Sequence, residues 1–180
     1  MYITLINVPN KFDACELFNA VVFYGESLIG KRMLASINLR IIFVSKLEVE
    51  CHITGDCGWE DDSIRPRDFM IRLDAEMGKR KMLISLAHEM VHVKQYAKSE
   101  MRDMLHHSTT KWFKESVNTD EMNYWDLPWE IEAHGREVGL YVRFKNQWME
   151  EKKNAKAAYK AQPSCAGTTH TFVLKENRKK

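Results

Sequence analysis

The sequence predicts a single α+β domain, and three observations support that prediction. The chain has 180 residues, which is enough for one domain with a substantial buried core. Residues 2–8, 39–44 and 68–74 are short runs rich in isoleucine, leucine and valine, as is typical of β-strands. Residues 83–104 repeat apolar side chains at helical spacing, and residues 128–158 form a second long segment compatible with a helix. We therefore expect helices packed on a short mixed sheet.

The N-terminal half is expected to alternate between strand and helix. A long helix is predicted over about residues 12–37, because its apolar residues recur at helical spacing. Gly25 and Gly30 are the positions at which this helix could be interrupted. Residues 51–61 are rich in glycine and aspartate, so they are expected to form a loop or a hairpin.

The C-terminal half is expected to contain two long helices with an insertion between them. The first helix follows Gly78 and is predicted to end near residue 107. Residues 105–127 are polar and aromatic and are predicted to form an insertion such as a hairpin. The last helix begins at Pro128, a residue that the first turn of a helix tolerates.

Composition favours a cytoplasmic globular protein. Hydrophobic residues make up 44% and charged residues 29% of the chain, and the net charge of +2 argues neither for nor against a nucleic-acid partner. No apolar run is long enough to span a bilayer, and the N-terminus lacks the basic region of a signal peptide. The four cysteines are scattered, which suits reduced thiols better than a disulfide framework. We expect residues 1–160 to form the domain and residues 161–180 to be a flexible C-terminal tail.

The most informative segment reads His88-Glu89-Met90-Val91-His92. Two histidines four residues apart lie on one face of a helix, where both imidazoles can bind a single Zn²⁺ ion. Glu89 lies beside them and can accept a proton from water that the metal activates. This combination predicts a zinc-dependent peptidase with Glu89 as the general base.

A zinc site of this kind needs a third protein ligand. Glu132 is the residue that we expect to supply it, because it shares a helix face with Gly135 and Gly139, and glycines let two helices approach closely. Glu130 points elsewhere on a regular helix and is interpreted as an acidic residue at the helix dipole. The other downstream candidates are histidines at a predicted helix end and two residues of the last helix: His106, His107, His134 and Glu137.

The two motifs together resemble those of the gluzincin metallopeptidases. In that family the third ligand is a glutamate in a Glu-Ala context, which Glu132-Ala133 matches here. The string from Leu127 to Glu137 is also similar to segments of small SprT-like, often phage-encoded metallopeptidases. The resemblance covers about residues 39 to 145. It implies a minimal zincin-like domain that binds one Zn²⁺ ion and hydrolyses peptide bonds, located in a bacterial host cytoplasm if phage-encoded.

Such enzymes usually have a second electrophile, and Tyr96, Tyr124 or His134 could supply it. The sequence departs from the gluzincin pattern in one respect and from the SprT pattern in two. The gap between His92 and Glu132 is longer than in many gluzincins, and the SprT pattern uses a third histidine and a zinc ribbon that this sequence lacks.

Two other interpretations stay open. A DNA-associated protease would use the lysine-rich residues 152–160 as its binding surface, although such a run is typical of a solvated helix face. A non-catalytic binding protein could hold zinc as a structural staple, but such a site has no need of Glu89. The partner expected in the main interpretation is a peptide or protein substrate, with no membrane involved.

The strand at residues 68–74 directly precedes the motif helix. We expect it at the sheet edge beside the cleft, where a substrate peptide would add as a further strand. Arg72 and Asp74 are charged residues of the kind that protect an edge strand from pairing with other chains. A central position, with a neighbouring strand on both sides, is the alternative, because periodicity does not fix the order of strands.

Overall fold

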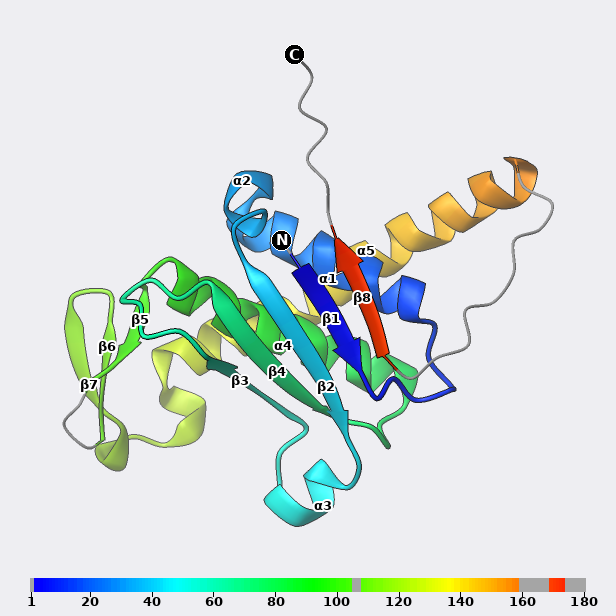
Figure 1. The fold of residues 1–180 in the computed structure, drawn as a ribbon. Helices are drawn as coiled ribbons and strands as arrows, with labels where there is room; N and C mark the ends of the chain where they lie inside the picture. Colours follow the sequence, from blue (N-terminus) through cyan, green and yellow to red (C-terminus); the bar gives the residue numbers. More distant parts are fainter. Residues whose placement is uncertain (1, 105–107, 159–168, 174–180) are drawn as a thin grey trace.

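A five-stranded mixed sheet forms the centre of the molecule (Figure 1). The computed structural model describes residues 2–104, 108–158 and 169–173. Its strands β1, β2 and β4 are parallel, and β3 and β8 pair antiparallel with β4 and β1 at the two edges. The strand order is β3-β4-β2-β1-β8, with bounds Tyr2–Ile6 (β1), Asn38–Val44 (β2), Gly55–Trp59 (β3), Asp68–Asp74 (β4) and Thr169–Val173 (β8).

The order of the strands corrects one prediction. Strand β4 has the predicted bounds of residues 68–74, but it is central and not at the edge, because β2 and β3 pair with it on either side. The edge strand on that side is β3, which lies in the segment expected to be a loop or hairpin. Of residues 161–180, which were expected to form a C-terminal tail, the structure describes only β8, which pairs with β1; residues 161–168 and 174–180 lie outside the described part of the chain.

Three long helices lie on one side of this sheet (Figure 1); the first two contact its strands, and the third packs mainly on those two helices. They are α1 (Ala14–Ile29), α4 (Lys79–Ala97) and α5 (Pro128–Ala158), while α2 (Lys31–Leu34) and α3 (Leu47–Cys51) are short connections. Alternate residues of the parallel strands are buried beneath the helices, because successive side chains of a strand point to opposite faces. These buried residues include Ile3, Leu5, Leu39, Ile41, Phe69 and Ile71. An α+β fold is therefore confirmed.

The ends of the helices follow local backbone chemistry. The side chain of Asp13 caps α1 by accepting hydrogen bonds from two backbone amides, and Gly30 ends that helix at a φ of 79°. The predicted helix over residues 12–37 is thus two helices. Helix α4 ends at Ala97, before the predicted end near residue 107, because Ser99 adopts a positive φ of 57°.

The segment between α4 and α5 forms the predicted insertion. It contains a small antiparallel sheet of β5 (Met101–Asp103), β6 (Thr109–Trp112) and β7 (Glu115–Asn118), followed by two 3₁₀ turns, η1 (Thr119–Glu121) and η2 (Tyr124–Asp126). His106 and His107 lie outside the described residues. Among the helices of the described chain, none is long and apolar enough to cross a membrane.

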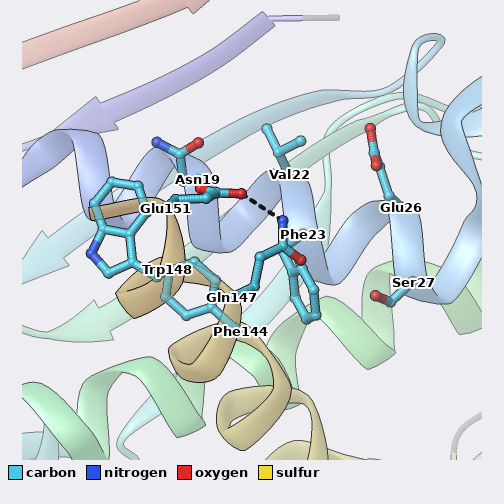
Figure 2. Close-up of a pocket in the computed structure, with 9 residues that line it drawn as sticks. All are labelled: Asn19, Val22, Phe23, Glu26, Ser27, Phe144, Gln147, Trp148 and Glu151. Carbon is cyan, nitrogen blue, oxygen red and sulfur yellow. Dashed lines mark hydrogen bonds between the residues drawn. The ribbon is translucent and has the colours of Figure 1, made fainter. Parts of the chain in front are cut away.

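Helices α1 and α5 contact each other through aromatic residues and leave a groove of about 310 Å³ between them (Figure 2). The rings of Phe23, Tyr24 and Phe144 lie with centroids 5.7 to 6.0 Å apart. Glu16 is 2% exposed and forms ion pairs with Lys79 of α4 and Lys145 of α5, the latter at 2.9 Å. This single carboxylate therefore ties the three long helices together.

Glu16→Gln should lower the free energy of unfolding by about 1–3 kcal/mol at neutral pH, because it removes two charge-assisted hydrogen bonds. Burial raises the pKa of Glu16, but the bonds from Lys79 and Lys145 outweigh it and hold the pKa below 4.5. The stabilisation is therefore complete above about pH 4.5, the unfolded value, and is lost as the pH falls through the folded pKa. Urea unfolding of both proteins across this pH range measures it; an unchanging difference would contradict the assignment.

Candidate functional site

The three motif residues of α4 are buried but lie outside its core-facing stripe of apolar residues. Leu83, Leu86 and Met90 of the same helix pack into the core, each at most 1% exposed. His88 and His92 are 8% exposed and Glu89 is 5% exposed, and all three line a cleft. The helical repeat separates these two faces, as the sequence predicted.

His88, His92 and Glu130 come together as a set of candidate metal ligands. The two Nε2 atoms lie 3.1 Å apart, and the Glu130 carboxylate lies 3.2 Å from His88 Nε2 and 3.5 Å from His92 Nε2. All of the donor atoms lie within 4.8 Å of one another, and all three residues are buried. Two imidazole nitrogens and one carboxylate oxygen are a donor set that zinc prefers, so these residues fit a metal ion.

Glu130, and not Glu132, is the carboxylate beside the two histidines. Glu132 instead accepts hydrogen bonds from Lys94 at 2.6 Å, Gln95 at 3.1 Å and Arg136 at 2.8 Å. It points away from the imidazoles because α5 packs on α4 through a face that includes Ala133, which is fully buried.

The glycine argument failed for a simple geometric reason. Gly135 and Gly139 are exposed, and a Cβ atom added at either position would meet nothing within 4 Å. They therefore face solvent and bring no helices together. Glu130 precedes the buried Ala133 by three residues and lies on the packed side of α5.

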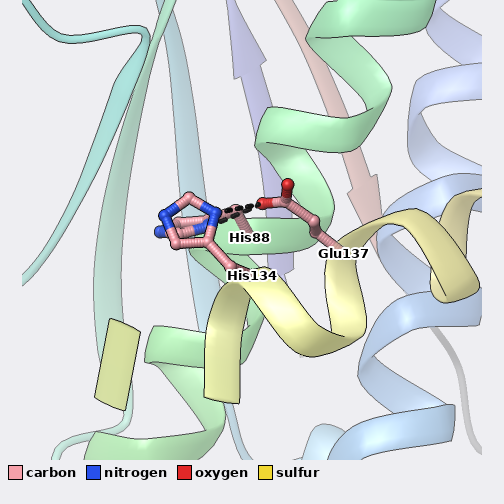
Figure 3. Close-up of side chains that lie close together, drawn as sticks. All are labelled: His88, His134 and Glu137. Atoms are coloured by element: carbon pink, nitrogen blue, oxygen red, sulfur yellow. Dashed lines mark hydrogen bonds and ion pairs between the residues drawn. The ribbon is translucent and has the colours of Figure 1, made fainter. Parts of the chain in front are cut away.

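Each motif histidine is oriented by a second side chain. The Nδ1 atom of His88 lies 2.8 Å from a carboxylate oxygen of Glu137 (Figure 3), and His92 Nδ1 lies 2.8 Å from Gln95 Oε1. Gln95 in turn donates to the backbone carbonyl of Trp129 at 3.0 Å. Such partners fix the ring orientation and leave the Nε2 atoms free to bind a metal.

A second group of possible ligands consists of His88, His134 and Glu137 (Figure 3). His134 Nδ1 lies 3.4 Å from the Glu137 carboxylate, and its Nε2 atom has no hydrogen-bond partner in the described part of the chain. Both members from α5 are only partly buried, whereas the first group is buried throughout. We assign Glu137 to the positioning of His88 because its carboxylate contacts the nitrogen that faces away from His92.

Glu89 lies directly beside the candidate ligands and against the edge strand. A Cβ atom at Gly55 of β3 would approach Glu89 Oε1 to 3.1 Å, so glycine leaves room for this carboxylate. Burial raises the pKa of Glu89 to about 8, with a smaller lowering contribution from His88. Burial lowers the pKa of His88, but its bonds to Glu130 and Glu137 outweigh burial and raise the pKa to about 9. Burial lowers the pKa of His92.

The cleft around these residues has a volume of about 900 Å³. Helix α4 forms its floor, β3 forms one wall, and α5 with η2 forms the other. Tyr124 of η2 donates from its hydroxyl to Glu130 at 2.7 Å, and the Trp125 ring lies 4.8 Å from the His134 ring. Tyr96 lies further along the cleft, where its hydroxyl contacts Asp103 at 3.4 Å.

The structure thus brings together most of the residues singled out in the sequence, with Glu130 in place of Glu132. Gln95 and Gly55 were missed. Gln95 follows His92 by three residues on the same helix face, which is a signal that could have identified it. Gly55 had no such signal, because its role depends on the pairing of β3 with β4.

No family model, curated protein or solved structure matches the chain, so function is argued from this geometry.

Glu130→Ala should remove most of the bound metal when the purified protein is equilibrated with zinc, because it deletes the carboxylate of the donor set. Glu132→Ala should retain metal, and it serves as the matched control on the same turn of α5. Elemental analysis after gel filtration measures both. Equal metal contents, or a larger loss in the Glu132 variant, would show that the wrong carboxylate has been assigned.

Proposed function

We propose that the protein is a zinc-dependent metallopeptidase. The observation that carries this proposal is the convergence of His88, His92 and Glu130 beside the buried carboxylate of Glu89, at the floor of an open cleft. A structural zinc site is usually closed by four protein ligands and needs no base. Three donors and an adjacent carboxylate are instead the arrangement of a hydrolytic site.

A zinc ion held by these three residues would supply the Lewis acidity that activates water and polarises a peptide carbonyl. Glu89 then acts as the general base, accepting a proton from the attacking water as the new C–O bond forms. It returns that proton to the nitrogen of the leaving amine as the C–N bond breaks. Burial raises the pKa of the Glu89 carboxyl above its usual value, which makes it a stronger base than an exposed carboxylate.

Two side chains are candidates for stabilising the negative charge that develops on the carbonyl oxygen. Burial and the nearby Glu130 raise the pKa of Tyr124, so its hydroxyl stays protonated and can donate. His134 lines the same wall of the cleft, with an Nε2 atom that has no partner among the described residues. Tyr96 is the weaker candidate because its hydroxyl lies toward Asp103, away from the candidate metal ligands that the Tyr124 hydroxyl contacts.

Strand β3 offers a substrate peptide an edge on which to pair. It forms the end of the sheet on that side and lines the cleft at the level of Glu89. Main-chain hydrogen bonds would then supply affinity without demanding a particular sequence. We therefore propose for β3 the substrate-binding role that was expected of the strand at residues 68–74.

The gluzincin-type family membership, the zincin-like fold and the cytoplasmic location belong to the same proposal. The departure in the third ligand leaves the chemistry unchanged, because Glu130 is also a glutamate that begins the helix after the motif.

An action on DNA-bound protein has no specific support. Lys152 forms an ion pair with Asp13 at 3.8 Å and lies over the Trp148 ring, as a helix-surface residue does, and residues 159–160 lie outside the described chain.

Glu89→Gln should abolish peptide hydrolysis while zinc stays bound, because the amide cannot accept the proton. We expect a loss of at least about 10²-fold in kcat, from the usual contribution of a general base. Hydrolysis of unfolded casein and the zinc content are measured in parallel, with Glu50→Gln, an exposed residue of α3, as the control. Near-normal turnover by the Glu89 variant would refute the mechanism.

Binding of a peptide should slow amide hydrogen exchange in residues 55–59 and leave residues 68–74 unchanged. The first set gains main-chain partners on its outer edge, whereas the second is already paired on both sides. Exchange followed by mass spectrometry on the zinc-loaded Glu89→Gln protein, with and without a peptide, measures both segments. Protection that appears elsewhere in the cleft but not in β3 would argue against strand addition.

A further inference from the structure

The cleft has a direction, because β3 and α4 run side by side in the same sense. Thr54 directly precedes β3, and its hydroxyl oxygen lies 3.3 Å from that of Ser85 in the first half of α4. Near their ends, the rings of Trp59 and Tyr96 lie with centroids 4.4 Å apart. The candidate metal ligands lie between these two levels, so the cleft continues past them toward both ends of α4.

The face of α4 that lines the cleft carries residues at four-residue intervals, namely Arg80, Ile84, His88, His92 and Tyr96. At a rise of about 1.5 Å per residue, Arg80 lies about 12 Å along the helix from His88. The end of the cleft at Arg80 is also lined by Lys81 and His52. This end is therefore basic.

Arg80 is the cation at this end that has no carboxylate partner among the residues that the structure describes. Lys79 pairs with Glu16, and Lys81 pairs with Glu48 at 2.7 Å. Arg80 is exposed and its guanidinium lies 5.6 Å from the centre of the Tyr141 ring. Within the described residues, no carboxylate oxygen lies within 4 Å of it. Its charge is thus available to a ligand in the cleft.

The opposite end of the cleft has the opposite character. Asp103 of β5 lines it, and its two carboxylate oxygens accept hydrogen bonds from Tyr96 at 3.4 Å and Thr110 at 3.3 Å. Tyr96 also lines the cleft there, and its ring packs against that of Trp59. An anionic group of a substrate is repelled at this end and attracted at the other.

A peptide that adds to β3 in the more stable antiparallel sense runs against the direction of β3 and α4. Its C-terminal residues then lie toward Thr54 and Arg80, and its N-terminal residues toward Trp59 and Asp103. An extended peptide advances about 3.3 Å per residue, so Arg80 lies about three to four residues from the scissile bond.

We infer that Arg80 selects peptides that carry a carboxylate on the C-terminal side of the scissile bond, three to four residues beyond it. This inference rests on the proposed peptidase function and names its substrate class. The carboxylate can belong to a glutamate or aspartate side chain, or to the C-terminus of a substrate that ends at that position. Arg80 is a specificity-determining residue in either case.

Peptide affinity tests the inference without requiring turnover. Two labelled peptides of identical composition carry Glu near one end and Lys near the other, in opposite orders, with amidated C-termini. Their Kd values for the zinc-loaded Glu89→Gln chain are measured by fluorescence anisotropy. The peptide with Glu toward its C-terminus should bind about threefold to fivefold more tightly, as expected for one exposed ion pair, and the preference should shrink at high salt.

A neutral peptide compared as free acid and as amide identifies the source of the carboxylate. A free-acid preference that is lost on amidation marks the chain terminus, and a preference confined to the Glu peptides marks the side chain. Either result supports the inference, and equal affinities in both comparisons overturn it.

The matched variants are Arg80→Glu and Arg143→Glu. Both arginines lie on exposed helix positions with the guanidinium 5.6 Å from an aromatic ring, but only Arg80 lines the cleft. Arg80→Glu should abolish or invert the preference, and Arg143→Glu should leave it intact. An unchanged preference in the Arg80 variant, equal loss in both variants, or a preference for Glu toward the N-terminus overturns the inference.

The cleavage assay separates this inference from the proposed function. If the wild-type protein cleaves peptides but binds the two Glu- and Lys-containing peptides with equal affinity, the assignment of Arg80 is wrong and the peptidase proposal stands. If the preference for a C-terminal carboxylate depends on Arg80 but no peptide is cleaved, the peptidase proposal is wrong and the assignment of Arg80 as a peptide-binding residue stands.

Discussion

The packing of α5 against α4 is the contact on which the site depends. Helix α4 supplies both histidines and the base, but it has no third ligand of its own. Glu130 and Glu137 reach His88 from α5, one at each nitrogen of the ring. Because α5 follows α4 only after the insertion of small strands and 3₁₀ turns, the site forms only when the tertiary fold is complete.

A polar network holds this helix pair in register. Lys94 lies between Glu132 and Glu100, at 2.6 Å from each, and is 7% exposed. Gln95 connects His92 to the backbone of Trp129 and to Glu132. Removing one member of such a buried network leaves its partners unsatisfied, which costs more than the lost bond itself. Glu132 therefore stabilises the contact between α4 and α5 and is not one of the candidate metal ligands.

The sequence was most informative where chemistry depends on local spacing. The placement of His88 and His92 on one helix face, with Glu89 beside them, follows from helical periodicity. The start of α5 followed from Pro128, and the bounds of β4 followed from a short run of apolar residues. The choice between Glu130 and Glu132 depended on which face of α5 meets α4. The prediction of Glu132 relied on Gly135 and Gly139, which are exposed, and small residues indicate a close contact between helices only when they are buried.

Long-range strand order was likewise inaccessible from local patterns. The apolar alternation of β4 suits an edge or a central strand equally well. Its position was decided by β3, a strand of Gly55, Asp56, Cys57, Gly58 and Trp59 whose composition resembles a loop. The same pairing brings Gly55 against Glu89 and aligns β3 with α4. The direction of the cleft therefore follows from a strand that propensity does not predict.

Anomalous diffraction at the zinc absorption edge, from crystals of the protein grown with zinc, tests the central claim most directly. The account predicts one strong peak about 2.0–2.2 Å from His88 Nε2, His92 Nε2 and a carboxylate oxygen of Glu130. A peak held by His134 and Glu137, or by Glu132, would contradict it, as would the absence of any peak at the floor of the cleft.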